Sequence, residues 1–203
     1  MYARALIIAA TLAAAGPVGA DEPAGSSDSQ TPEKQPTQEI GARLGLEAGG
    51  RVTPGGLHVE GAYLYRFTDI DWLEQVVGFT FGGQSAECFR DRSDEVVCDH
   101  GILNGFSAEL GLAVRRYFPG QGVFSPFARA GLAVRGVFYS ADDLRGIAVP
   151  IWLGGGVRAT VTKGISVTAD ASLKTGFGIL NRGLGLEPNA SFAITAGAEF
   201  VLD

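Results

Sequence analysis

Residues Ile165 to Lys174 read ISVTADASLK, and apolar and polar side chains alternate at every step. Successive side chains of a β-strand point to opposite faces. One face would therefore carry isoleucine, valine, two alanines and leucine, and the other serine, threonine, aspartate, serine and lysine. A helix would scatter the apolar set around its axis, because its side chains repeat every 3.6 residues. The stretch predicts a strand with one apolar and one polar face.

The same alternation recurs along most of the chain. Residues 106–115 and 191–200 repeat it clearly, with phenylalanine, leucine, isoleucine and alanine on one face. Weaker copies lie at about 40–51, 57–67, 72–82, 127–138 and 147–161. No internal run reaches the roughly 18 apolar residues of a spanning helix. Eight strands satisfy the even count of a closed bacterial barrel. We expect an all-β fold, an eight-stranded antiparallel up-and-down transmembrane β-barrel over residues 39–203.

The expected connections alternate in length. Residues 68–71, 119–122 and 162–164 form short turns, whereas 83–103, 139–146 and 179–189 form long loops. Short periplasmic turns and long outer loops are typical of outer-membrane barrels. The first outer loop, 53–56, is an exception because it is brief. Pro150 lies inside an expected strand, where it removes a ladder donor, so we expect a bulge or a late strand start there.

The first twenty residues differ from the rest. Arg4 precedes an almost wholly apolar run from Ala5 to Ala15, and Val18, Gly19 and Ala20 fit a small-residue cleavage site. We expect a signal peptide that is cut after Ala20 and therefore export. The chain has a net charge of −6, and loss of Arg4 makes it about −7. This acidic balance argues against nucleic acid as a partner.

Residues 21–38 contain prolines, small polar residues and alanine as their only aliphatic. Such a composition cannot offset the entropy of ordering. We expect a disordered periplasmic tail; a spacer to a partner or to peptidoglycan is the alternative.

Two hairpins carry a family resemblance. The run Arg116-Tyr117-Phe118-Pro119-Gly120, followed by Phe124-Ser125-Pro126-Phe127 and Gly131, resembles the middle hairpin of small outer-membrane β-barrels of the OmpX and OmpW kind. Leu153 to Arg158, followed by Thr162 to Val167, looks like that family's next hairpin. The resemblance implies an outer-membrane location and no catalytic positions. The chain departs from the family at its end, where Phe200 is followed by Val201, Leu202 and Asp203 and no aromatic residue is last.

The polar strand faces collect many charges. If the apolar faces contact lipid, the lumen receives Arg43, Glu47, His58, Glu60, Arg66, Glu74, Glu109, Arg115, Arg129, Arg135, Arg158, Asp170, Lys174 and Glu199. An eight-stranded barrel is only wide enough for its own side chains, so these charges should pair and plug it. Adjacency predicts the pairs Arg66–Glu74 and Arg43–Glu199; solvated strand ends without specific pairing are the alternative.

Aromatic residues cluster where expected strands meet turns. Tyr65, Phe67 and Trp72 would form an inner girdle, and Phe81, Phe138 and Tyr139 an outer one.

Catalytic signals are weak. The two histidines are His58 and His100. His58 has Glu60 two residues on, but no adjacent His-Ser pair of the lipid A deacylase type is present.

The loop from Glu87 to Asp99 holds five carboxylates and two arginines. That density could attract divalent cations or basic partners, although a solvated loop explains it as well.

We therefore expect a monomeric structural or surface-interaction barrel without catalysis, cofactor or metal. Its partners would be outer-membrane lipid and extracellular ligands bound by the outer loops. A lipid-modifying barrel enzyme is one rival. A soluble lipocalin-like binder of a small ligand is the other, and it would need an apolar lumen and a polar outside.

Cys88 and Cys98 should form a disulfide that closes the longest outer loop. They lie ten positions apart in a chain that we expect to be exported to an oxidising compartment. Free thiols are the alternative, and two thiols near His100 do not make a four-ligand zinc set. Closing such a ring restrains the unfolded chain by roughly 2–3 kcal/mol. Thiol labelling of unreduced, denatured protein should leave both cysteines unmodified; labelling of both would rule the bridge out.

Overall fold

The computed structural model describes residues 38–50, 52–84, 88–90, 95–98, 103–140, 144–181, 183 and 185–202. Eight long strands form one closed barrel. They are β1 (Gln38–Ala48), β2 (Gly56–Arg66), β3 (Asp71–Gln84), β6 (Leu103–Tyr117), β7 (Phe124–Tyr139), β8 (Leu144–Thr162), β9 (Ile165–Leu180) and β10 (Leu186–Leu202). The expected eight-stranded antiparallel fold is confirmed. The expected signal peptide and most of the expected tail lie outside the described residues, and Gln38 already belongs to β1.

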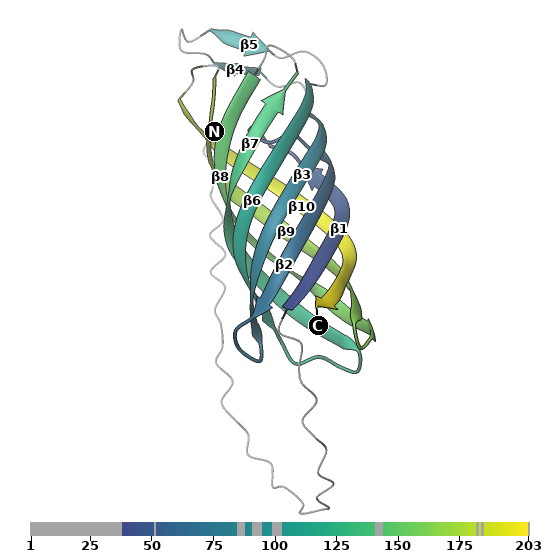
Figure 1. The fold of residues 1–203 in the computed structure, drawn as a ribbon. Coiled ribbons are helices and arrows are strands. Elements are labelled where there is room, and N and C mark those ends of the chain that lie inside the picture. Colours follow the sequence, from purple (N-terminus) through teal and green to yellow (C-terminus); the bar gives the residue numbers. More distant parts are fainter. Residues whose placement is uncertain are drawn as a thin grey trace, which may run out of the picture. The chain divides into compact units, whose positions relative to one another are not determined.

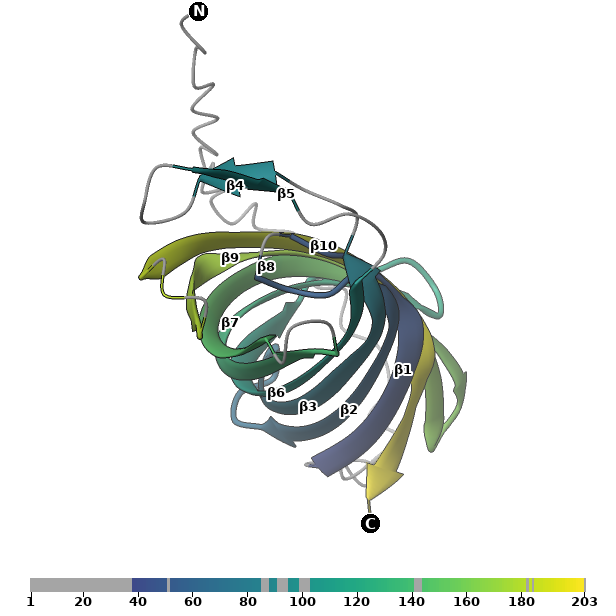
Figure 2. The same ribbon diagram turned by 90° about the horizontal axis from the view of Figure 1, so that it is seen from above.

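All neighbouring strands are antiparallel, and β1 closes the barrel against β10 (Figures 1 and 2). Following the paired residues once around the wall from Gln38 leads back to β1 at Ala48, ten residues further on. This stagger requires the strands to tilt steeply against the barrel axis, by about 35–45° in such barrels. The tilt is visible in Figure 1. A barrel of this size has an interior that side chains can fill.

The strand faces divide as the alternation predicts. In β9, Ser166, Thr168 and Asp170 are buried in the lumen, while Ile165 and Val167 are exposed on the outside. Across the whole wall, the exposed large residues are mainly leucine, isoleucine, valine and phenylalanine, and the buried polar residues include most of the charged side chains of the strands. The interior therefore holds most of the charged side chains of the strands, together with some apolar ones, and the outer surface is apolar.

The expectation of a bulge at Pro150 is wrong. β8 begins at Leu144, and its register with β7 is the same before and after Pro150, with Leu132 opposite Ile151 and Arg135 opposite Ala148. The ladder only skips the two intervening pairs, because Pro150 has no N–H to donate. The register shift in β8 lies instead between Thr160 and Thr162.

The short connection between β1 and β2 closes the outer mouth. Val52 and Thr53 are fully buried, and Val52 packs with Val137, Tyr139, Leu144, Ala148 and Leu180. The Thr53 hydroxyl donates to Asn189 Oδ1 at 2.9 Å. The Gly55 amide donates to the Gly83 carbonyl at 3.3 Å. The brief loop thus acts as an apolar cap over the polar lumen.

A separate two-stranded ribbon lies in the long connection between β3 and β6. It consists of β4 (Cys88–Arg90) and β5 (Val96–Cys98), with Cys88 directly opposite Cys98. Directly opposed residues have Cα atoms about 4.5–5.5 Å apart, within the span of a disulfide. The bridge itself remains a prediction. Within the described residues, no helix is long and apolar enough to cross a membrane.

A cation on the outer face should destabilise the barrel in a bilayer according to its depth. Leu112 lies near the middle of the wall and Phe118 directly follows β6 at the inner rim, and their exposed fractions are 47% and 46%. Leu112→Arg should cost about 2–4 kcal/mol, because a charge enters hydrocarbon, and Phe118→Arg about 0–1 kcal/mol. Urea unfolding of protein refolded in phosphatidylcholine vesicles measures both. Equal stability of Leu112→Arg and the wild type would invert our assignment of the two faces.

Candidate functional site in the barrel lumen

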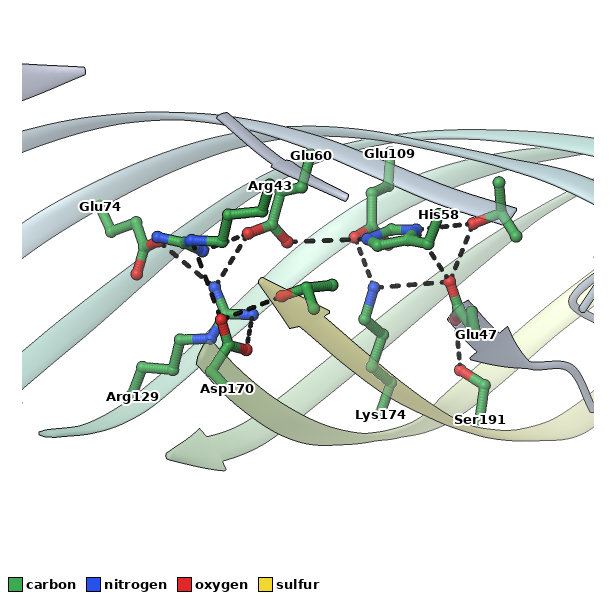
Figure 3. A network of polar contacts seen from close by, with 12 residues as sticks. Arg43, Glu47, His58, Glu60, Glu74, Glu109, Arg129, Asp170, Lys174 and Ser191 are labelled. Atoms are coloured by element: carbon green, nitrogen blue, oxygen red, sulfur yellow. Dashed lines mark hydrogen bonds and ion pairs between the residues drawn. The ribbon is translucent and has the colours of Figure 1, made fainter. Parts of the chain in front are cut away.

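Arg43 of β1 lies in the lumen among acidic side chains (Figure 3). Its Nη2 donates to Glu74 Oε1 at 2.6 Å and to Glu199 Oε1 at 3.1 Å, and its Nη1 donates to Glu60. These carboxylates come from β3, β10 and β2. One guanidinium therefore joins four strands, including both strands of the closing seam.

Two further arginines complete this group from the opposite wall. Arg115 of β6 donates to Glu74 Oε1 at 2.7 Å and to Glu199 Oε1 at 2.5 Å. Arg129 of β7 donates to Glu60 at 3.1 Å and to Asp170 at 2.8 Å. A carboxylate buried away from water is stabilised only by such pairing. Alternating positive and negative side chains thus span the lumen from wall to wall.

A second group of charges lies in the outer half. Arg135 donates to Glu47 Oε1 at 2.8 Å and also to Glu109. Lys174 Nζ donates to the other oxygen of Glu109 at 2.6 Å. Ser191 donates to Glu47 at 2.7 Å. Figure 3 shows Glu47, Glu109, Lys174 and Ser191 of this group beside Arg43 and its acidic neighbours, with His58 between Glu60 and Glu47. His58 Nε2 lies 3.7 Å from Glu60 Oε2.

At the inner end, Arg158 closes the network. Its two terminal nitrogens donate to the two oxygens of Glu39, each at 2.8 Å. Arg158 is stacked over the Tyr117 ring at 5.6 Å from the centroid. A two-pronged bond fixes both partners in orientation as well as distance.

Apolar side chains fill the lumen between the charges. Val76, Ala113, Ala133 and Trp152 form one buried cluster, and Ala62, Leu64 and Trp72 form another towards the inner end. A Cβ built at Gly111 would lie 2.3 Å from the Trp152 ring, so only glycine leaves room for that ring. Lys174 Nζ lies 5.6 Å from the Trp152 ring centroid, a cation–π distance. The lumen is packed rather than hollow along this part.

The expected charges enter the lumen, but the two expected pairs differ in outcome. Arg43 bonds Glu199, as adjacency at the seam suggested. Arg66 does not pair with Glu74; it donates to Asp69 Oδ1 at 2.6 Å and to the Thr68 carbonyl. Arg66 ends β2 opposite Trp72, so the adjoining turn is closer than Glu74. Glu109, Arg129, Arg135 and Arg158 all join the network described above.

Sequence reasoning missed several lumen residues and misplaced two aromatics. Glu39 has the same parity as Arg43 along β1 and could have been found by extending the alternation by one pair. Trp152 lies between Ile151 and Leu153, which point outward, and all three are apolar, so the sequence does not show that Trp152 points into the lumen.

Trp72 and Tyr139 are buried in the lumen, so the expectation that they belong to the aromatic girdles is wrong. Tyr65, Phe67, Phe81 and Phe138 are exposed on the outside, as expected.

His58 has the contacts that acid–base chemistry would need, but in a closed site. Its Nδ1 lies 2.9 Å from the Thr80 hydroxyl and 3.2 Å from Glu47, and Thr80 donates to Glu47 at 2.8 Å. A nucleophile must be reachable by substrate. His58 and Thr80 are each 1% exposed, under the apolar cap. The imidazole therefore fits a structural role in the network.

His58, Glu60 and Glu109 also resemble a metal-binding triad. Their ligand atoms lie within 4.8 Å of one another. Glu109 already accepts from Arg135 and Lys174, and Glu60 from Arg43 and Arg129. A metal ion would have to displace these cations, so the donor set does not fit one.

The fold matches solved outer-membrane barrels. Neisserial surface protein A is 14% identical with a TM-score of 0.56 over 81% of this chain and 96% of its own. The N-terminal β-barrel domain of OprF from Pseudomonas aeruginosa is 16% identical with a TM-score of 0.51 over 82% of this chain and 100% of its own. The outer membrane enzyme PagL is 14% identical with a TM-score of 0.43 over 81% and 99%.

The two comparisons with TM-scores above 0.5 establish the fold alone. No family model matches the chain, and no curated protein matches its sequence.

Removing one shared carboxylate should destabilise the barrel strongly. Glu74 is fully buried and accepts from Arg43, Arg115 and Arg129. Glu74→Gln should lower the free energy of unfolding by about 3–5 kcal/mol, because guanidinium groups lose a buried counter-charge. Asp69→Asn, which removes the counter-charge of Arg66 at the exposed turn, is the matched control and should change it far less. Urea unfolding followed by tryptophan fluorescence measures both. Equal changes in the free energy of unfolding would show that Glu74 stabilises the barrel no more than a surface ion pair does.

Proposed function

We propose that this protein is a monomeric outer-membrane barrel that acts through its rigid wall and its outer loops, without turnover and without conducting ions. The observation that carries the proposal is the lumen: charge pairs cross it at successive levels, and apolar side chains fill the space between them. Lipid contacts the wall, and extracellular ligands bind to the loops at the outer mouth.

The apolar outside supports the membrane location. Leu110, Leu132 and Leu153 are each more than half exposed on adjacent strands. In water such a continuous apolar surface would be unfavourable, whereas in a bilayer it is the required outer band. A soluble lipocalin-like binder would need the opposite arrangement and does not fit.

The lack of access supports a non-catalytic role. The contacts among His58, Thr80 and Glu47 are the nearest approach to a catalytic arrangement in the described part of the chain. They lie inside the lumen and do not reach the outer wall. The barrel fold itself does not decide between enzymes and structural proteins, because sites are built on a fold independently.

Outer-loop binding is the remaining part of the proposal. The connection between β3 and β6 carries the acidic stretch from Glu87 to Asp99. A Cys88–Cys98 bridge would limit the conformations of this loop and so lower the entropic cost of binding a partner.

The membrane location is tested by fractionation and by electrophoresis before and after boiling. The protein should be found with outer membranes, and boiling should shift its band, since a closed barrel stays folded in cold detergent. A soluble protein with a heat-insensitive band would refute the location.

The plug predicts electrical silence. Refolded protein in planar bilayers should give no stable unitary currents, because a water path would require many buried pairs to break at once. The main effect of Glu109→Ala should be a loss of barrel stability, with little rise in conductance, because the substitution removes the partner of Arg135 and Lys174. A heat-shift gel of the same sample controls for folding. Currents of porin size from folded protein would refute the plug.

A further inference from the structure

An ion pair lies on the outer face of the wall, apart from the network in the lumen. Arg116 of β6 pairs with Asp71 of β3 across the two strands. Arg116 follows the buried Arg115 and has the outward parity of the exposed Val114, and Asp71 has the outward parity of the exposed Val77. Arg116 Nε donates to Asp71 Oδ1 at 2.6 Å, and Nη2 donates to Oδ2 at 2.8 Å. A charged pair therefore stands on a surface that is otherwise apolar.

A hollow of about 430 Å³ lies directly beside this pair. Its lining includes Phe67, Asp71, Val114, Arg116, Ala128, Ala130 and Leu153. Ala128 pairs with Arg116, and Ala130 pairs with Val114 on one side and with Leu153 on the other. The short alanine side chains of β7 form the floor, and the longer side chains of β6 and β8 form the walls. The hollow thus has a cation at one end and continues as an apolar groove towards the middle of the wall.

Arg116 keeps hydrogen-bond donors available for a ligand. A guanidinium group has five N–H donors, and Asp71 accepts from two of them. Among the described residues Arg116 has no other hydrogen-bond partner, and its side chain is 56% exposed. Asp71 therefore compensates the charge of Arg116 but leaves the remaining donors unsatisfied. Polar donors beside hydrocarbon are costly unless they find an acceptor.

The pair lies at the level where lipid headgroups begin. Asp71 is the first residue of β3, and Arg116 is the last but one of β6, so both are at the inner rim. Phe67 and Phe118 beside them are 53% and 46% exposed, and aromatic side chains are typical of the membrane–water interface. The acceptor that a bilayer offers at this level is a phosphate group, and the planar fork of a guanidinium group matches phosphate oxygens.

We infer that this hollow binds a phospholipid of the inner leaflet. The lipid phosphate accepts hydrogen bonds from the N–H groups of Arg116 that Asp71 does not use. One acyl chain lies along Ala128 and Ala130, between Val114 and Leu153. The inference rests on the membrane location proposed above and adds to it a specific lipid site.

Native mass spectrometry of full-length protein folded in octyl glucoside tests the role of the phosphate. Dimyristoylphosphatidylcholine should bind more tightly than dimyristoylglycerol, which has the same acyl chains, no net charge and no phosphate. Arg116→Gln should weaken binding of the phospholipid by roughly 10- to 100-fold, the range that hydrogen bonds to a charged group supply, and should not affect dimyristoylglycerol. Arg145→Gln is the matched control, because it removes an exposed arginine at the outer end of β8, and it should change neither affinity.

Asp71→Asn separates a lipid site from a structural ion pair. This substitution breaks the same ion pair as Arg116→Gln but keeps the guanidinium group and removes its competing anion. Phospholipid binding should therefore be preserved or strengthened. Equal weakening by Asp71→Asn and Arg116→Gln would show that the pair only maintains the local structure, and would overturn the inference.

Filling the groove tests the place of the acyl chain. Ala130→Trp should weaken binding of both lipids, because the indole occupies the floor of the hollow. Ala42→Trp, on the outer face of β1, should leave both affinities unchanged. A heat-shift gel of each variant confirms that the barrel is folded. Unchanged affinities in folded Ala130→Trp would place the lipid elsewhere.

Further outcomes would also overturn the inference. Equal affinity of the wild type for the two lipids would show an apolar hollow without a phosphate site. Millimolar inorganic phosphate that displaces the phospholipid would show a site for a free anion, and protein dimers in place of lipid adducts would show a second copy in the hollow. Protein that fails to float with dioleoylphosphatidylcholine vesicles would refute the membrane location and the lipid site with it, whereas the other outcomes refute the site alone.

Discussion

Burial of charge inside a closed wall of eight strands is the constraint on which the rest of this structure depends. The lumen of an eight-stranded barrel is only wide enough for side chains, and here it is too polar to be an ordinary core. Each charged side chain that points inward must therefore find its counter-charge on another strand. Arg43 meets three carboxylates from three other strands, and Glu74 accepts from three arginines. These contacts can form together only if the strand register and the closure of the barrel bring the charged side chains to the same level in the lumen.

The charged centre also explains where the apolar lumen residues lie. Val52 and its neighbours close the outer mouth, Trp152 packs in the middle, and Trp72 packs towards the inner end. Apolar packing above and below an ion pair excludes water and strengthens the pair. The same packing leaves His58 and Thr80 buried, each only 1% exposed. The wall and the outer rim remain as the surfaces that other molecules can reach.

The fold could be predicted from the sequence because the alternation of apolar and polar side chains repeats every two residues. Alternation in β9 and β10 needs only neighbouring residues, and the two faces follow directly. The partners of each charge could not be predicted in the same way, because they depend on stagger. Arg66 and Glu74 have the right parity, yet Arg66 ends its strand beside a turn that offers Asp69. Trp152 and Val137 lie in runs where both faces are apolar, so alternation could not show which residue turns inward. The burial of Val52 depends on how a loop folds back, which no periodic pattern encodes.

The position of Arg43 has a consequence for how the barrel assembles. Arg43 belongs to the first strand and Glu199 to the last. Arg115 and Arg129 come from the middle of the chain and bond to carboxylates that also bond to Arg43. A barrel open at the seam would expose these groups to water, with hydration in place of pairing. Closure exchanges that hydration for several ion pairs in one event. The contact of Arg43 with Glu199 therefore forms only when the first and last strands meet, so closure of the seam completes the set of ion pairs that Arg43 makes with Glu60, Glu74 and Glu199.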